Sequence, residues 1–148
     1  NKSLQMKSLI IIGILFFNFT SSVSSSESLK SGSGANKEVY FIAPKDGQTV
    51  SQTFKVVFGL SGMGVAPAGI KVKNTGHHHL LIDTEKLPNM NQPLPGTEKI
   101  KHFGGGQTQT ELTLSPGTHT LQLLLGNHMH IPHKPPILSQ KIIVIVEK

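Results

Sequence analysis

The stretch PGTHTLQLLLG, residues 116–126, decides the fold class of this chain. Residues 116–117 are Pro-Gly, a tight-turn pair, and residues 118–125 that follow are rich in leucine and threonine, which predicts a core β-strand. Successive side chains of a strand point to opposite faces. One face of this strand therefore carries His119, Leu121, Leu123 and Leu125.

Further stretches on both sides of this strand have the same short, β-prone character. The predicted strands are residues 39–42, 54–60, 77–84, 100–103, 107–114 and 137–146. Loops rich in glycine and proline separate them, at residues 61–76, 87–96 and 126–136. No segment shows a sustained helical period. The pattern predicts an all-β, antiparallel, immunoglobulin-like β-sandwich over residues 38–148.

The N-terminal part reads as a targeting segment followed by a linker. Lys2 and Lys7 precede an apolar run at residues 9–19, and small polar residues follow it. This order predicts a signal peptide over residues 1–24 and a flexible Ser/Gly-rich leader over residues 25–37. We therefore expect a periplasmic or secreted protein, with no stable membrane span once the signal is removed.

The charge of the chain excludes one class of partner. Its fourteen basic residues are all lysines, and removal of Lys2 and Lys7 leaves twelve against eight acids, a net charge of about +4. Arginine is the usual reader of phosphates and guanine edges, so its absence argues against nucleic-acid binding. The chain also has no cysteine, so the exported fold must form without disulfides.

Histidine is the residue type that carries functional information. Eight histidines are present, and most lie in two short runs, residues 77–79 and 128–133, with another at the start of a glycine-rich segment at residue 102. Neutral imidazole is the commonest protein ligand for late first-row metals, and no thiolate competes here. The candidate metal ligands, for a copper or zinc ion, are His77, His79, His102, His128, His130 and His133.

The strand pattern indicates that these groups can meet. His77 and His79 are two residues apart on one strand and so share a face, whereas His78 points to the other face and is interpreted as a buried structural residue. His77 begins its strand, and residues 128–133 follow the end of theirs. If the two strands are antiparallel neighbours, both groups lie at one rim, and His102 joins them if its strand is antiparallel as well.

Two other interpretations of the histidines stay open at this point. Some imidazoles could brace loops by hydrogen-bonding to backbone groups. His119 is set apart from the others, because its parity with Leu121 and Leu123 predicts an inward, structural residue. A catalytic histidine without metal is the other possibility, but the chain has no nucleophile elbow and no cysteine. Asp83 and Glu85 are the only general-base candidates for a metal-dependent hydrolase.

Several long motifs resemble a known family. They are GLSGMGVAPAG at residues 59–69, NTGHHHLLID at residues 74–83, HFGGGQT at residues 102–108 and PGTHTLQLLLG at residues 116–126. They are similar to those of a family of small exported bacterial proteins that is known only as a domain of unknown function. The resemblance implies a single secreted or periplasmic domain in a bacterium and brings no activity with it.

The sequence therefore predicts an exported metal-binding protein rather than an enzyme. We expect copper first and zinc second, for metal holding or delivery outside the cytoplasm, by the chemistry of the candidate ligands alone. The alternative is a cell-envelope interaction module that binds a protein or a glycan and uses its histidines structurally. The expected partners are a metal ion and, in the alternative, an envelope protein.

Overall fold

The computed structural model describes residues 36–148, and this part of the chain is all-β, as predicted. The predicted signal peptide, residues 1–24, and the leader up to residue 35 lie outside the described residues. Within residues 36–148 there is no helix with the length and hydropathy to cross a bilayer. The strands are β1 (Glu38–Ala43), β2 (Gln48–Val50), β3 (Thr53–Ser61), β4 (Gly64–Val65), β5 (Thr75–Ile82), β6 (Ile100–His102), β7 (Gln109–Thr113), β8 (Gly117–Gly126) and β9 (Ile142–Val146).

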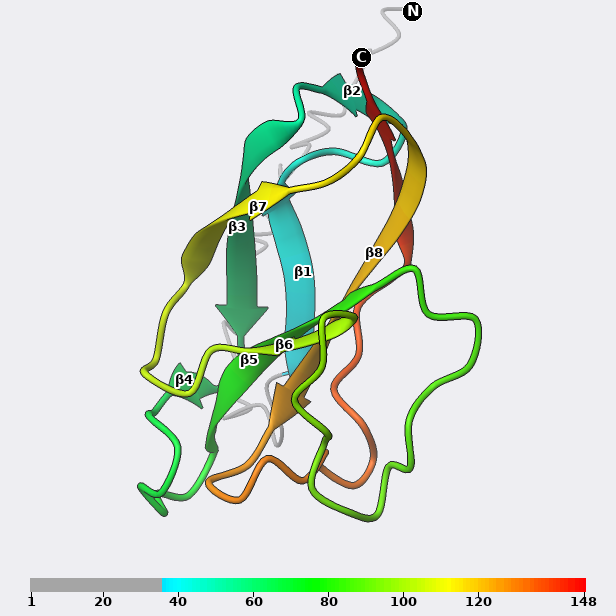
Figure 1. Ribbon diagram of the computed structural model, residues 1–148. Helices are drawn as coiled ribbons and strands as arrows, with labels where there is room; N and C mark the ends of the chain where they lie inside the picture. Colours follow the sequence, from blue (N-terminus) through cyan, green and yellow to red (C-terminus); the bar gives the residue numbers. More distant parts are fainter. Residues whose placement is uncertain (1–35) are drawn as a thin grey trace, which may run out of the picture. The chain divides into compact units, whose positions relative to one another are not determined.

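These strands form two sheets (Figure 1). One has the order β1-β3-β7 and the other the order β2-β9-β8-β5-β4, with β6 also paired to β5. The long pairs are antiparallel, whereas the short pairs β2–β9 and β4–β5 are parallel. The sequence did not predict β2 and β4, which have three and two residues. Strand β4 lies inside the glycine-rich stretch at residues 61–76 that was expected to be a loop.

The inner faces of the two sheets meet in one hydrophobic core, which confirms the predicted sandwich. Val56 and Phe58 of β3 are buried in the same cluster as Leu80 of β5. Leu121, Leu123 and Leu125 of β8 belong to it as well. The alternation read from the sequence therefore gives the correct inward face for β8.

Strand β5 is buried on both faces. Its other face packs with a second cluster that contains Leu81, Leu94, Ile100 and Leu124. Leu94 lies in the long loop between β5 and β6, so this loop covers the outer face of β5. In Figure 1 the green loop after β5 and the orange loop after β8 lie together at the lower end of the sandwich. Side chains on this face of β5 are thus enclosed by loops.

The last strand begins later than the sequence predicts. Residues 137–146 were expected to be continuous, but β9 starts at Ile142. The hydroxyl of Ser139 accepts a hydrogen bond from the backbone N–H of Leu123 at 2.8 Å and donates one to the carbonyl of Gln140. A side chain thus occupies a backbone donor of β8, which interrupts the ladder before β9 begins.

Candidate functional site

Two of the candidate ligands are fixed by β5. His77 pairs with Gly126 and His79 with Leu124 in the antiparallel ladder between β5 and β8. Because they are two residues apart, both side chains leave the outer face of the sheet. Both residues are fully buried, at 0 % exposure. The expected common face is confirmed, as is the antiparallel arrangement that brings the end of β8 beside the start of β5.

The third imidazole comes from the loop after β8. His130 has a positive φ of 60°, a conformation that few residues other than glycine adopt. The loop holds it there: the backbone N–H of His130 donates to the carbonyl of Asn127 at 2.9 Å. The Asn127 side-chain oxygen accepts from the N–H groups of Met129 and Ile131, and the carbonyl of His130 accepts from Leu94. Such a backbone outlier is often found at functional sites.

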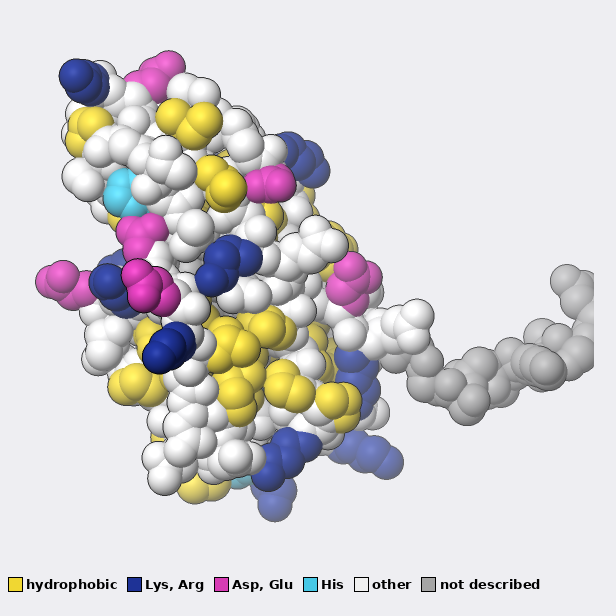
Figure 2. All heavy atoms as spheres, turned by 90° about the vertical axis from the view of Figure 1, so that its right-hand side faces the viewer, with side chains coloured by type: hydrophobic (Ala, Val, Ile, Leu, Met, Phe, Trp, Pro, Cys, Tyr) yellow, Lys and Arg dark blue, Asp and Glu magenta, His cyan; other side chains and the backbone are white. Residues whose placement is uncertain are grey.

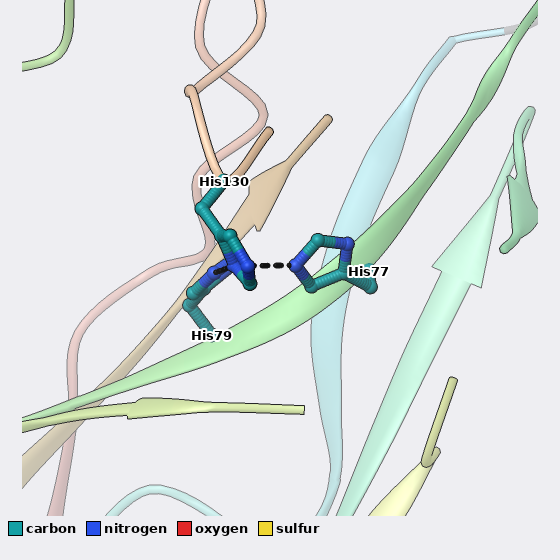
Figure 3. Close-up of side chains that lie close together, drawn as sticks. All are labelled: His77, His79 and His130. Carbon is teal, nitrogen blue, oxygen red and sulfur yellow. Dashed lines mark hydrogen bonds between the residues drawn. The ribbon is translucent and has the colours of Figure 1, made fainter. Parts of the chain in front are cut away.

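The three imidazoles point at one another (Figure 3). Nδ1 of His130 lies 2.9 Å from Nε2 of His77 and 3.1 Å from Nε2 of His79. One ligand atom from each ring falls within 4.8 Å of the other two, and this set (the three-histidine cluster) contains no acidic residue. His130 Nδ1 has one lone pair or one proton, so it cannot satisfy both neighbours fully. A cation on which three lone pairs converge would do so.

Burial keeps the cluster neutral. It disfavours the imidazolium and, together with the neighbouring His130, lowers the pKa of His77 from 6.5 to about 4. Burial, reinforced by His77, lowers the pKa of His79 to about 3. Burial and the proximity of His102 lower the pKa of His130 as well. All three rings are therefore neutral at pH 7 and present unprotonated nitrogens, which metal binding requires.

The rings of the cluster are hydrogen-bonded to one another rather than to the carbonyls of the loops. His130 Nδ1 is within hydrogen-bond distance of Nε2 of both His77 and His79, and Nδ1 of both His77 and His79 is buried without a partner in the described residues. His133 does act as a brace, since its Nε2 donates to the carbonyl of Thr75 at 3.3 Å. The bracing interpretation thus applies to His133.

His102 adjoins the cluster. It pairs directly with His79 across β5 and β6, as the antiparallel arrangement requires. Its ring centroid lies 4.5 Å from that of His79 and 4.6 Å from that of His130. It does not belong to the set of three converging ligand atoms, and its Nε2 is buried without a partner in the described part of the chain.

His128 and His133 lie outside the cluster. Both line a hollow of about 500 Å³ beside residues 70–75. Met129, which lies between His128 and His130 in the sequence, is 55 % exposed. Of the six predicted ligands, the structure therefore gathers three, places His102 against them, and leaves two apart.

His119 and Asp83 form a separate pair. Nδ1 of His119 lies 2.7 Å from Oδ2 of Asp83, and its Nε2 lies 2.8 Å from the carbonyl of Ser115. His119 is thus a structural residue, as expected. Asp83 also accepts from the N–H of Thr120, so it is not free to act as a general base beside the cluster.

Two positions that support the site were not identified from the sequence. A Cβ added to Gly126 would lie 2.5 Å from Cε1 of His79, so only glycine lets that ring pack over the end of β8. Asn127 is the second, because it holds the turn that presents His130. The only sequence signal for these two residues is their position between a core strand and a run of histidines. A Gly-Asn pair at that position is also typical of an ordinary loop.

Comparison with known proteins gives one family and no activity. The sequence profile described as "Domain of unknown function (DUF4399)" matches residues 56–147. No curated protein matches the chain. Among solved structures, an endo-beta-1,4-mannanase from Thermotoga petrophila is similar at 17 % identity and a TM-score of 0.47. The match covers 80 % of this chain but only 22 % of the enzyme's chain.

Proposed function

This chain belongs to the DUF4399 family of unknown function, and we propose that it binds a transition-metal ion through His77, His79 and His130. The observation that carries the proposal is the convergence of three imidazole nitrogens from two distant segments. Three histidines are a common ligand set for zinc and also suit copper.

The spacing of the nitrogens is close to that of a real site. With metal–nitrogen distances of about 2.0–2.1 Å and tetrahedral angles, ligand nitrogens lie about 3.3 Å apart. The observed distances from His130 Nδ1 are 2.9 and 3.1 Å. Movements of a few tenths of an ångström in the loop that carries His130 would open these two distances to this spacing. The third pair, His77 and His79, lies within 4.8 Å and would have to adjust to the same value.

We propose copper as the first choice and zinc as the second. Divalent copper binds nitrogen donors more tightly than zinc in the Irving–Williams order. The role that we propose is holding or delivery of the ion outside the cytoplasm, which rests on the predicted signal peptide. His130 is only partly buried, whereas His77 and His79 are enclosed, so the ion would enter and leave on the His130 side.

Titration calorimetry with copper(II) and zinc(II), on tag-free protein lacking residues 1–24, tests the proposal. The double variant His77→Ala/His79→Ala and the single variant His130→Ala should both lose binding. His128→Ala is the matched control, because it removes an imidazole from the same loop but outside the cluster, and it should bind like the unmodified protein.

The same titration decides between metal binding and the alternative function, an interaction module. If the unmodified protein takes up neither ion more tightly than about 1 μM, roughly −8 kcal/mol, metal binding is wrong. The interaction module for an envelope protein or glycan then becomes the better proposal, since His119 and His133 already use their rings to hold backbone carbonyls. Equal loss in His128→Ala would move the metal site to the loop surface.

A further inference from the structure

The lower end of the sandwich carries an exposed surface formed by two loops. This tip surface comprises residues 69–75, which are the end of the β4–β5 loop and the first residue of β5, and residues 127–134, after β8. Three aliphatic side chains on it are half exposed or more: Ile70 at 52 %, Val72 at 55 % and Met129 at 55 %. Isolated exposed apolar residues are ordinary, but three of them at one end of a small domain are not explained by the fold.

The charge of the tip surface has a single sign. Lys71 and Lys73 alternate with Ile70 and Val72, and Lys134 lies in the second loop; all three lysines are exposed. No aspartate or glutamate occurs in residues 47–82 or 112–146, the stretches that supply both loops. On the face shown in Figure 2, lysines also occur higher up among the acidic side chains, but the charged side chains at the lower end are all lysines.

The two loops are held together as one surface. The backbone N–H of Gly69 donates to the carbonyl of His128 at 2.8 Å. The ring of His133 is hydrogen-bonded to the carbonyl of Thr75. Residues of both loops line the hollow of about 500 Å³, among them Lys71, Lys73, His128 and His133. The aliphatic and basic groups are therefore presented in a fixed arrangement.

We propose that the tip surface docks on a lipid bilayer that contains anionic lipids. Lysines next to such a surface are attracted by its negative potential, and aliphatic side chains between them enter the headgroup region. A protein partner fits less well. Protein interfaces are enriched in tyrosine, tryptophan, phenylalanine and arginine and depleted in lysine, and residues 69–75 and 127–134 contain none of these four enriched residue types.

The docking proposal does not depend on metal binding. It rests on the exposed side chains of the tip surface, none of which belongs to the three-histidine cluster: Ile70, Lys71, Val72, Lys73, Met129 and Lys134. The tip surface and the three-histidine cluster are adjacent, because Met129 of the tip surface precedes His130 of the cluster in the chain. Sedimentation of the protein with vesicles can therefore be measured with and without copper, and each proposal can fail alone.

The experiment is co-sedimentation of the protein lacking residues 1–24 with vesicles of phosphatidylglycerol and phosphatidylcholine, and with vesicles of phosphatidylcholine alone. We expect binding only to the anionic vesicles, weakened by salt. Lys71→Gln/Lys73→Gln should reduce the binding constant about 20- to 30-fold, at about fivefold for each lysine. Ile70→Ser/Val72→Ser should reduce it about tenfold and leave the salt dependence in place.

Ile143→Ser/Ile145→Ser is the matched control, because these residues are exposed at 45 % and 43 % but lie on β9. It should bind vesicles like the unmodified protein, and thermal unfolding of each variant confirms that it is folded. Absence of sedimentation, equal binding to both vesicle types, or an equal loss in the control would overturn the proposal. If the protein binds polyglutamate as tightly as it binds anionic vesicles, and Ile70→Ser/Val72→Ser does not change that affinity, the result would instead indicate an acidic protein partner.

Discussion

His79 and His102 lie directly opposite each other in the antiparallel pair of β5 and β6, with their ring centroids 4.5 Å apart and nearly perpendicular. His102 also contacts the ring of His130, at 4.6 Å. One imidazole thus touches two members of the three-histidine cluster without adding a ligand atom to it. Its position indicates that it sets the orientation of the two rings.

Removal of this imidazole should weaken metal binding without abolishing it. We expect His102→Ala to reduce the affinity for copper or zinc about 10- to 100-fold, the usual effect of losing a group that orients metal ligands. Lys101→Ala, one residue away on β6, is the control and should have no effect. Titration calorimetry measures both. A loss as complete as that of His130→Ala would instead show that His102 is itself a ligand.

Gly126 sets a second requirement of the site. A Cβ at this position would lie 2.5 Å from Cε1 of His79 and 3.1 Å from its Nδ1. Gly126→Ala should therefore push the His79 ring out of line and reduce metal affinity by at least about tenfold. Gly64→Ala is the matched control, since its Cβ would meet only Thr75 Cγ2 at 3.6 Å. Unchanged metal uptake by a folded Gly126→Ala protein would contradict the geometry of the cluster.

The fold was readable from the sequence because the strands alternate. The parity of residues 118–125 correctly assigned Leu121, Leu123 and Leu125 to the core, and the glycine and proline loops marked the ends of most strands. The same reasoning placed His77 and His79 on one face. It failed where pairing depends on a side chain, as at Ser139, whose hydroxyl takes a backbone donor of β8 and delays β9.

The sequence could not predict which of the six candidate ligands lie together. Whether His128 or His130 turns toward β5 depends on a backbone with φ of 60° and on a turn held by Asn127. Neither has a periodic signature. The enclosure of the cluster is equally unreadable, because it comes from a loop contact of Leu94 with the carbonyl of His130, far apart in the chain.

The pair formed by His119 and Asp83 predicts a pH dependence of stability. Partial burial disfavours both charges, but the hydrogen bonds of the pair outweigh it, so the pKa of His119 is raised and that of Asp83 is lowered. The His119 contribution is present below about pH 6.5 and is lost as pH rises through its raised pKa. The Asp83 contribution is present above about pH 3.9 and is lost as pH falls through its lowered pKa.

Asp83→Asn should therefore destabilise the protein most between about pH 4 and 6.5. The Asp83 side chain is 37 % exposed, so solvent screening limits the expected loss to about 1 kcal/mol in the free energy of unfolding. Asparagine tolerates the positive φ of this position and keeps an acceptor for Thr120. Urea unfolding at pH 5.5 and 8.5 measures the difference, with Glu111→Gln as the exposed control. A loss that grows at pH 8.5 would contradict a charged pair.

His78 gives the opposite expectation, a gain in stability. It is 1 % exposed, packs against Phe58 with ring centroids 5.0 Å apart, and neither ring nitrogen has a partner within residues 36–148. Leaving a buried polar group without a hydrogen bond costs about 1–3 kcal/mol. His78→Leu, which keeps an apolar side chain of similar size in the core, should raise the free energy of unfolding by about that amount at pH 7.

The gain from His78→Leu should increase in acid. Burial lowers the pKa of His78 to about 4, whereas in the unfolded chain it stays near 6.5, so the unfolded state takes up the proton first as pH falls. As pH falls from 6.5 to 4, His78 therefore lowers the free energy of unfolding by up to about 3 kcal/mol more than at pH 7. Leucine does not titrate, so His78→Leu avoids this loss. Urea unfolding at pH 7 and 5 tests this, with His128→Leu as the control. A destabilised His78→Leu protein at both pH values would contradict this expectation.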